Sequence, residues 1–269
     1  MTIDLYLILF GVGIIAGLLA GLLGVGGGVI IVPALIMVYS SLQVNNPYMV
    51  QTAIATSLFT IFFTAFSSTH RQTKNKNVLW DQAIIIGISS SLSVFLFSKI
   101  ALSLPGNTLK KIFAIVMILM AIKMLTEKKK TSVENESNTN YHVIFSPFIG
   151  LLGGVVAAFT GLGGGLFIVP MMHYIQKIPI KKCTGTSSAA IIITSISGVA
   201  SYLINKPADA IQIKYSLGMV DTLSAIPIII ASIPLAQAGV YLNKIINHKL
   251  LTKIFGILLV VMAVKMYFF

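Results

Sequence analysis

The chain has 269 residues, of which 56% are hydrophobic and only 10% are charged, with a formal net charge of +12. This apolar fraction exceeds what a soluble domain needs for its core, so the composition indicates a polytopic membrane protein. The basic residues lie between apolar segments, which favours an orientation signal over nucleic-acid binding. A single cysteine, Cys183, excludes an intramolecular disulfide and a cysteine-based metal cluster.

Ten apolar segments are expected along the chain, five on each side of a polar stretch. Most are long enough to cross the hydrocarbon core, which takes about 20 residues, but 29–41 and 166–176 are too short. The expected segments are 5–23, 29–41, 50–69, 79–103 and 109–125, then 143–160, 166–176, 183–204, 215–243 and 250–268.

The same motifs occur in the same order on both sides of the polar stretch, which indicates an internal duplication. Gly-x-Gly-Gly-Gly, with a proline five residues after its last glycine, occurs at 24–33 and again at 161–170. A Thr-Ser pair follows each copy in the next segment. The sequence therefore predicts three parts: a first membrane repeat at 1–125, a polar cytoplasmic linker at 126–142 and a second membrane repeat at 143–269.

Basic residues suggest how the segments are oriented, because Lys and Arg accumulate in cytoplasmic loops. A cytoplasmic loop around Arg71 also places the 126–142 linker inside and both termini outside. With five segments in each half, the second repeat would enter the membrane from the opposite side. If the two short segments re-enter, eight full crossings remain and the repeats stay inverted. Inverted repeats that exchange around a midplane site are one way in which secondary transporters alternate access.

The two glycine loops are the main candidates for a substrate site. Glycine costs about 1 kcal/mol relative to alanine inside a helix, and irregular backbone at membrane depth is tolerated where protein buries it or it lines a cavity. Bare backbone before a helix could hold an anion through N–H groups. Close helix packing is the alternative, and the duplication favours a site. The candidate residues are Gly26, Gly27, Gly28 and Pro33, with Gly163, Gly164, Gly165 and Pro170.

Many Ser and Thr side chains occur in the two segments that follow the short ones, 50–69 and 183–204. Thr56 and Ser57 recur as Thr186 and Ser187, and these four residues are further candidates because they could donate to an oxyanion. Interhelical hydrogen bonds, or bonds to carbonyl groups of the same helix, explain any one of them at least as well.

Ionisable residues inside the segments have simpler explanations. Asp81 and Asp221 stand near the starts of corresponding segments, where helix N-capping is favoured over a coupling-ion or proton role. Lys123 is expected to extend toward the membrane interface. His173 follows the second loop and could carry protons, although a lone histidine more often just finds a hydrogen-bond partner.

Signatures of an enzyme are missing from the sequence, which has no His-Glu-x-x-His, no Gly-x-Ser-x-Gly and no phosphate-binding Gly-Lys-Ser/Thr motif. We therefore expect no catalytic residue, no metal site, no cofactor and no nucleic-acid partner. Transport would use an existing gradient, with a proton as a candidate coupling ion. A homo-oligomer is an open alternative.

The doubled glycine motif, each copy with its proline and a Thr-Ser pair in the next segment, resembles the TauE/SafE sulfite exporter family of bacterial membrane permeases. The resemblance covers essentially the whole chain, including Ser216–Asp221. It implies export or uptake of small sulfur-containing or organic anions, such as sulfite and sulfonates, without ATP hydrolysis in the bacterial cytoplasmic membrane. The first half departs from the family at Phe97 and Lys99, where relatives often have glycines and the second half has Ala238 and Gly239.

The sequence thus predicts an all-α, multi-pass inner-membrane protein with eight to ten transmembrane or re-entrant helices in two inverted repeats. Its partners would be the lipid bilayer and a small anionic substrate, with sulfite or an organosulfonate as the expected substrate. The alternatives are a carrier for a different small solute and a membrane assembly subunit that transports nothing.

Overall fold

The computed structural model is all-α and describes residues 3–43, 46–126, 143–207, 216–243, 245–246 and 248–268. The predicted linker lies outside these ranges except for Thr126. The first half forms α1 (Ile3–Leu23), α2 (Gly28–Ser41), α3 (Met49–Lys74), α4 (Trp80–Ser103) and α5 (Gly106–Leu125). The second half forms α6 (Ser146–Thr160), which a short 3-10 turn (Val143–Phe145) precedes, then α7 (Gly165–Ile175), α8 (Ile180–Ile204), α9 (Thr222–Leu242) and α10 (His248–Phe268).

The predicted segment 215–243 begins as a short β-hairpin before α9 starts. Strand β1 (Ser216–Leu217) pairs antiparallel with β2 (Val220–Asp221), so that Ser216 lies opposite Asp221. Gly218 has a φ of +59° and reverses the chain between the strands. The helix therefore starts seven residues later than the apolar pattern suggested.

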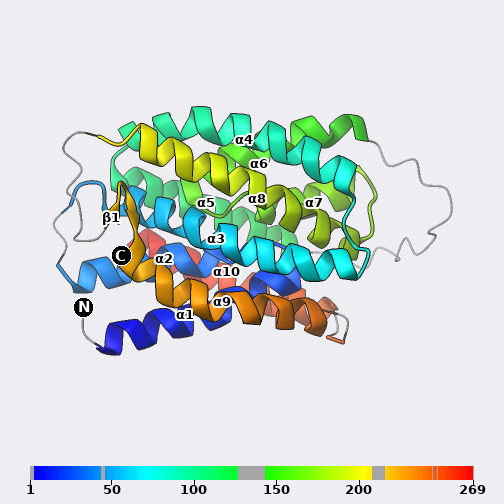
Figure 1. Cartoon of the computed structure of the whole chain (residues 1–269), viewed down its shortest axis with the longest axis horizontal. Coiled ribbons are helices and arrows are strands. Elements are labelled where there is room, and N and C mark those ends of the chain that lie inside the picture. The colour runs from blue at the N-terminus through cyan, green and yellow to red at the C-terminus, as the bar shows by residue number, and fades with distance from the viewer. Residues whose placement is uncertain are drawn as a thin grey trace.

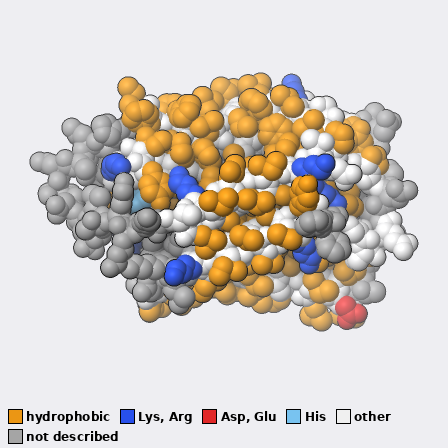
Figure 2. All heavy atoms as spheres, turned by 180° about the vertical axis from the view of Figure 1, so that it is seen from behind, with side chains coloured by type: hydrophobic (Ala, Val, Ile, Leu, Met, Phe, Trp, Pro, Cys, Tyr) orange, Lys and Arg blue, Asp and Glu red, His pale blue; other side chains and the backbone are white. Residues whose placement is uncertain are grey.

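Helix lengths agree with a membrane protein. In the part of the chain that the structure describes, six helices are long and apolar enough to cross a bilayer, and α2 and α7 are apolar but shorter, as predicted. Large apolar side chains such as Ile88, Leu92 and Ile230 face outward, and hydrophobic atoms cover the middle of the face in Figure 2. Such a surface is what lipid tails require, so the all-α polytopic prediction is confirmed.

Helices of one half pack mainly against helices of the other half. Helix α1 lies along α9 and α6 lies along α4, while α3 and α8 pack together and α5 packs against α10. In Figure 1, α1 begins and α10 ends on the same side, and α2 and α7 lie on opposite sides. The paired contacts agree with the predicted inversion, which stays a prediction together with the side of the membrane that each end faces.

Small residues let these helices approach closely, as is common in membranes. A Cβ at Gly17 of α1 would lie 2.6 Å from the carbonyl oxygen of Ser232 in α9. A Cβ at Gly154 of α6 would overlap the carbonyl oxygen of Ser90 in α4. The two contacts correspond between the halves, and both fix a helix of one half on a helix of the other.

The two halves differ in how α4 and α9 pack on their partner helices. Gly239 of α9 lies against the carbonyl oxygen of Leu18 in α1, with no room for a Cβ. At the related place in the first half, Phe97 packs instead against Phe159 of α6, with ring centroids 6.2 Å apart. The close backbone contact of one helix pair is thus replaced by an aromatic contact in the other.

Candidate functional site

The two glycine loops lie directly against each other. A Cβ at Gly28 would lie 2.7 Å from the carbonyl oxygen of Gly161, and a Cβ at Gly165 would lie 2.6 Å from that of Gly24. The structure thus brings the two predicted loops together from opposite halves of the chain.

The loops lie about half-way along the two central helices. A Cβ at Gly26 would lie 2.9 Å from Ile61 in α3, and one at Gly163 would lie 3.0 Å from Ile191 in α8. At 1.5 Å per residue, Ile61 is about 18 Å from the start of α3, and Ile191 is about 16 Å from the start of α8. This depth is where secondary transporters hold their substrates.

Glycine is required in these loops by conformation and by space. Gly27 and Gly164, which precede α2 and α7, have φ values of +85° and +80°. A Cβ at Gly27 would also lie 2.7 Å from the carbonyl oxygen of Ala16. Close packing, the alternative considered above, therefore explains the residue type.

Packing does not explain the amides that follow. The first hydrogen bonds of the two short helices run from Ile30 to Gly27 and from Phe167 to Gly164, at 3.1 and 3.0 Å. In the described ranges, the N–H groups of 26–29 and 163–166 have no acceptor. These residues are buried, and a buried amide without a partner costs about 1–3 kcal/mol. Such groups call for water or a ligand.

The predicted prolines lie one turn further along. Pro33 is buried inside α2, and Pro170 stands inside α7, and both helices continue past them. Proline lacks an N–H, so each ring leaves one more helical carbonyl without its usual donor. Pro170 lines a cavity, described next.

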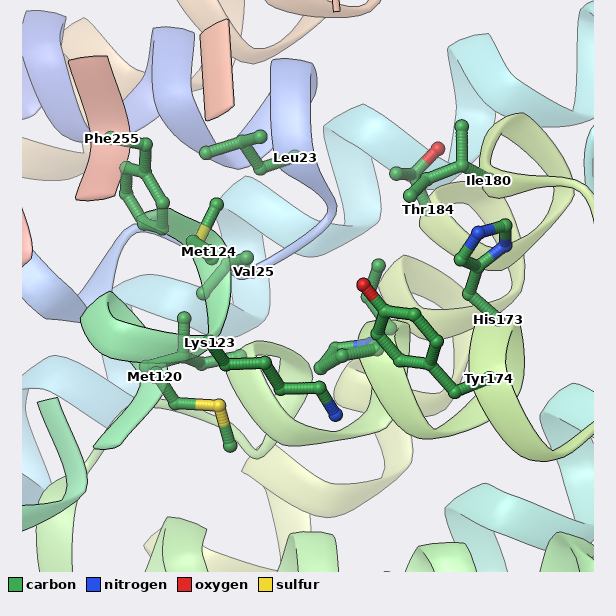
Figure 3. A pocket seen from close by; sticks show the side chains of 13 residues that line it. Leu23, Val25, Met120, Lys123, Met124, His173, Tyr174, Ile180, Thr184 and Phe255 are labelled. Carbon is green, nitrogen blue, oxygen red and sulfur yellow. The ribbon is translucent and has the colours of Figure 1, made fainter. Parts of the chain in front are cut away.

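A cavity of about 70 Å³ lies beside the loops, where α5, α7 and α8 meet. Val25 of the first loop and Leu166 and Pro170 of α7 contribute to its largely apolar wall. A water molecule needs roughly 10–15 Å³ on this measure, so the cavity has room for a small solute. Figure 3 shows its side chains converging from both halves of the chain.

Polar groups of the cavity come chiefly from α5 and α7. The ammonium group of Lys123 lies 4.4 Å from the ring centroid of Tyr174, a cation–π contact that is visible in Figure 3. His173 Nδ1 lies 2.9 Å from the carbonyl oxygen of Ile178. Since a carbonyl only accepts, Nδ1 donates there, which confirms that this histidine finds a hydrogen-bond partner. Lys123, which was expected to extend toward the interface, lines the cavity from the last turn of α5.

The four predicted hydroxyls divide into two pairs. Ser57 donates to the carbonyl oxygen of Gly161 at 2.9 Å, and Ser187 donates to that of Gly24 at 3.0 Å. Each serine thus supports the loop of the other half. The threonines accept backbone N–H groups, Thr56 from Asp221 at 2.9 Å and Thr186 from Leu79 at 3.0 Å. All four thus bond to the backbone of loops or of residues that precede helices, which is close to the alternative of interhelical bonds that the sequence left open for them.

Comparison with known proteins agrees with this architecture. Residues 9–266 match the family model described as Sulfite exporter TauE/SafE. The chain belongs to the TauE/SafE family. It is 32% identical over 256 residues to a probable membrane transporter protein of Haemophilus influenzae, a match that covers 95% of this chain and 96% of that protein.

Two further relatives of this TauE/SafE protein have names of the same kind. A probable membrane transporter protein of Methanocaldococcus jannaschii is 31% identical over 258 residues, 92% of this chain and 91% of the relative. One of Bacillus subtilis is 28% identical over 263 residues, 92% and 90% of the two chains. No solved structure shows a significant match. This TauE/SafE protein is thus a multi-pass membrane transporter of the bacterial cell membrane.

Capping by acids at α4 and α9 was predicted for both helices and is right for one. Asp221 is the N-cap of α9, and its side chain accepts from the N–H of Ser224. At α4 the N-cap is Leu79, without a side-chain bond, and Asp81 is exposed in the first turn. The N-cap position in this TauE/SafE transporter is therefore an acid in the second half only, and the acid of the first half stands two residues after the N-cap.

Proposed function

We propose that this transporter carries a small anion, with sulfite or an organosulfonate as the expected substrate, and has no catalytic activity. The substrate would bind where the N-terminal ends of α2 and α7 meet the cavity. The observation that carries this proposal is the set of buried amides at 26–29 and 163–166 that lack an acceptor in the described residues.

Two helix ends give this place its preference for negative charge. An N-terminal end bears a partial positive charge of roughly half an elementary unit, and its free N–H groups donate to anionic oxygens. Lys123 adds a full positive charge beside the cavity, where it is only partly exposed. The largely apolar lining excludes water and strengthens these interactions.

The anion would cross the membrane if access to the loop pair closed on one side of the membrane and opened on the other. The polar lining of the cavity is not repeated at the duplicated positions: His173 and Thr184 line the cavity, whereas the corresponding residues of the first half are Ile36 and Ile54, both buried. We propose alternating access, in which the two halves rearrange around the loops. The anion would enter from the side of the cavity and leave on the opposite side of the loop pair.

The alternatives are a carrier for a different solute and an assembly subunit that transports nothing. A cation carrier would place oxygen atoms, not amides and a lysine, at the site. A subunit without transport gains nothing from buried amides that lack acceptors, since each of them lowers its stability.

The test is uptake into liposomes that contain the purified protein, with labelled sulfite, sulfonates, thiosulfate, sulfate and acetate compared. Gly27→Ala is a poor probe, because strain and overlap with Ala16 would prevent folding. Lys123→Gln is better, and Lys265→Gln at the corresponding position of α10 is its matched control. We expect Lys123→Gln to raise KM about fivefold or more for the transported anion, and Lys265→Gln to behave as wild type. Folded protein that moves no anion, beside a working positive control, would contradict the proposal.

A further inference from the structure

A buried carboxylate, Asp221, lies in strand β2, and in Figure 1 its hairpin and α7, which lines the cavity, lie toward opposite ends of the molecule. Asp221 is 1% exposed. Its Oδ2 accepts from Tyr39 at 3.1 Å and from the Ser224 hydroxyl at 2.5 Å, and its Oδ1 accepts from the Ser224 N–H at 3.2 Å. In the described part of the chain, no basic side chain forms an ion pair with it. An ionised group buried in this way is costly, and inside membrane proteins such groups usually have a function.

The carboxylate is connected to both glycine loops through short chains of contacts. Its own N–H donates to Thr56, and the next residue, Ser57, holds the carbonyl of Gly161 in the second loop. Tyr39 belongs to α2, the helix that begins at the first loop. Asp221 therefore ties α9 to α2 and α3 at the helices that position the proposed anion site.

Helix capping alone does not account for an acid at this position. The same scaffold recurs in the first half, where the N–H of Leu79 donates to Thr186 and α4 starts without any side-chain cap. The counterpart of Tyr39 there is Gln176, which donates to Ser146. Asp221 and Tyr39 thus occur only in one of the two corresponding arrangements, where the other has Leu79 and Gln176.

Other ionisable groups on the packed elements are few or distant. Tyr39 is the one ionisable side chain of α2, and β1 has none. On α3, His70, Arg71 and Lys74 stand in the last turns, about 21 Å or more beyond Thr56 at 1.5 Å per residue. On α9 the one ionisable side chain is Tyr241, at the opposite end. Helix α8 lies against Gly218 of the hairpin through Leu203, and the hydroxyl of its Tyr202 donates to the carbonyl oxygen of Ala158. Asp221 is therefore the one acidic group on these elements, with Tyr39 as its neighbour.

We propose that Asp221 binds the proton that couples anion transport to a proton gradient, with Tyr39 as its positioning residue. This rests on the proposed function of the transporter. A proton fits better than a metal cation, because hydroxyl and N–H donors already direct their hydrogens at the carboxylate oxygens. The carboxylate takes a proton from water on one side of the membrane to form a neutral acid, and returns it to water on the other side. Only an O–H bond forms and breaks.

Protonation gives a physical link to opening. The three hydrogen bonds to Asp221 stabilise a neutral acid less than they stabilise a carboxylate, because hydrogen bonds to a charged acceptor are about twice as strong. The Tyr39 bond that holds α2 against α9 therefore weakens when Asp221 is protonated. Helix α2 can then move away from α9 on the side opposite to the cavity, which exposes the loop pair there.

The experiment compares exchange with gradient-driven uptake in the same liposomes, with sulfite as the probe and an internal pH dye. We expect Asp221→Asn to keep sulfite counterflow within about twofold of wild type, and to lose both uptake driven by a pH gradient and sulfite-dependent proton flux. Asp81→Asn, which removes the exposed acid at the related place in α4, should keep all three. Size-exclusion profiles would establish that each variant is folded.

The outcomes separate the two proposals. Absence of any sulfite flux in the folded wild type counts against the proposed function with this substrate. Wild-type flux that ignores a pH gradient, or that follows a sodium gradient instead, overturns the proton proposal alone, as does gradient-driven uptake by Asp221→Asn. If Asp221→Asn does not fold, Tyr39→Phe takes its place, and an unchanged pH dependence of uptake in that variant overturns the proposal.

Discussion

The hydroxyl group of Ser57 donates to the carbonyl oxygen of Gly161, so a helix of the first half fixes the glycine loop of the second. We expect Ser57→Ala to lower the free energy of unfolding by about 1–3 kcal/mol, because it leaves a buried carbonyl without a donor. Thermal unfolding in detergent would measure the loss. Ser103→Ala is the matched control: its hydroxyl is exposed and bonds only within its own helix, and a comparable loss there would contradict the explanation.

Close packing of α1 on α9 predicts opposite effects for two glycines of one helix. Gly17→Ala should destabilise the protein, because the new Cβ would lie 2.6 Å from the carbonyl oxygen of Ser232. Gly11→Ala meets nothing within 4 Å and should be neutral or stabilising by up to about 1 kcal/mol, the difference in helix propensity. Melting temperatures of the two variants would measure this difference in stability. Equal values would mean that the helices are not packed as described.

The contact between Lys123 and Tyr174 predicts a difference between two substitutions of the tyrosine. Tyr174→Phe keeps a ring under the ammonium and should leave KM for the transported anion within about twofold. Tyr174→Leu loses a cation–π contact worth about 0.5–2 kcal/mol, which corresponds to a change of roughly twofold to thirtyfold. If the lysine is positioned by the ring, KM rises only in the leucine variant. Initial rates over a range of substrate concentrations would distinguish the two.

Removal of the Tyr39 hydroxyl should change the pH dependence of gradient-driven uptake, because this hydroxyl donates to Oδ2 of Asp221 at 3.1 Å. Uptake by Tyr39→Phe and by wild type would be compared from pH 5 to 9. Superimposable pH profiles would contradict the assigned role of the hydroxyl.

Most helix positions could be predicted because long apolar runs end at charged residues, prolines or glycines. Segment 79–103 became α4 (Trp80–Ser103), and 143–160 became the turn and helix that end at Thr160. The start of α9 was missed because Ser216 to Val220 reads as part of an apolar run, and only the positive φ of Gly218 reverses the chain. The glycine loops could be identified as a candidate site from their duplication, whereas their contacts with each other depend on the packing of the two halves.

The role of Lys123 could not be read from the sequence. A lysine near the end of an apolar segment usually extends to the interface, and Lys265 repeats the pattern. Lys123 lies at a cavity because residues of α5 and α7, two helices from different halves, line it together. The one hint was that His173 and Tyr174 replace Ile36 and Met37 at the duplicated positions.

The crossed support of the loops also constrains how the protein is made. Gly24 is held by Ser187, and Gly161 is held by Ser57. When the ribosome has synthesised only the first half, its loop is already in the membrane but lacks the serine that completes it. That loop must wait for about 80 further residues, until α8, which ends at Ile204, has been inserted. Neither half can therefore complete its fold alone, because each supplies the serine that bonds to the glycine loop of the other.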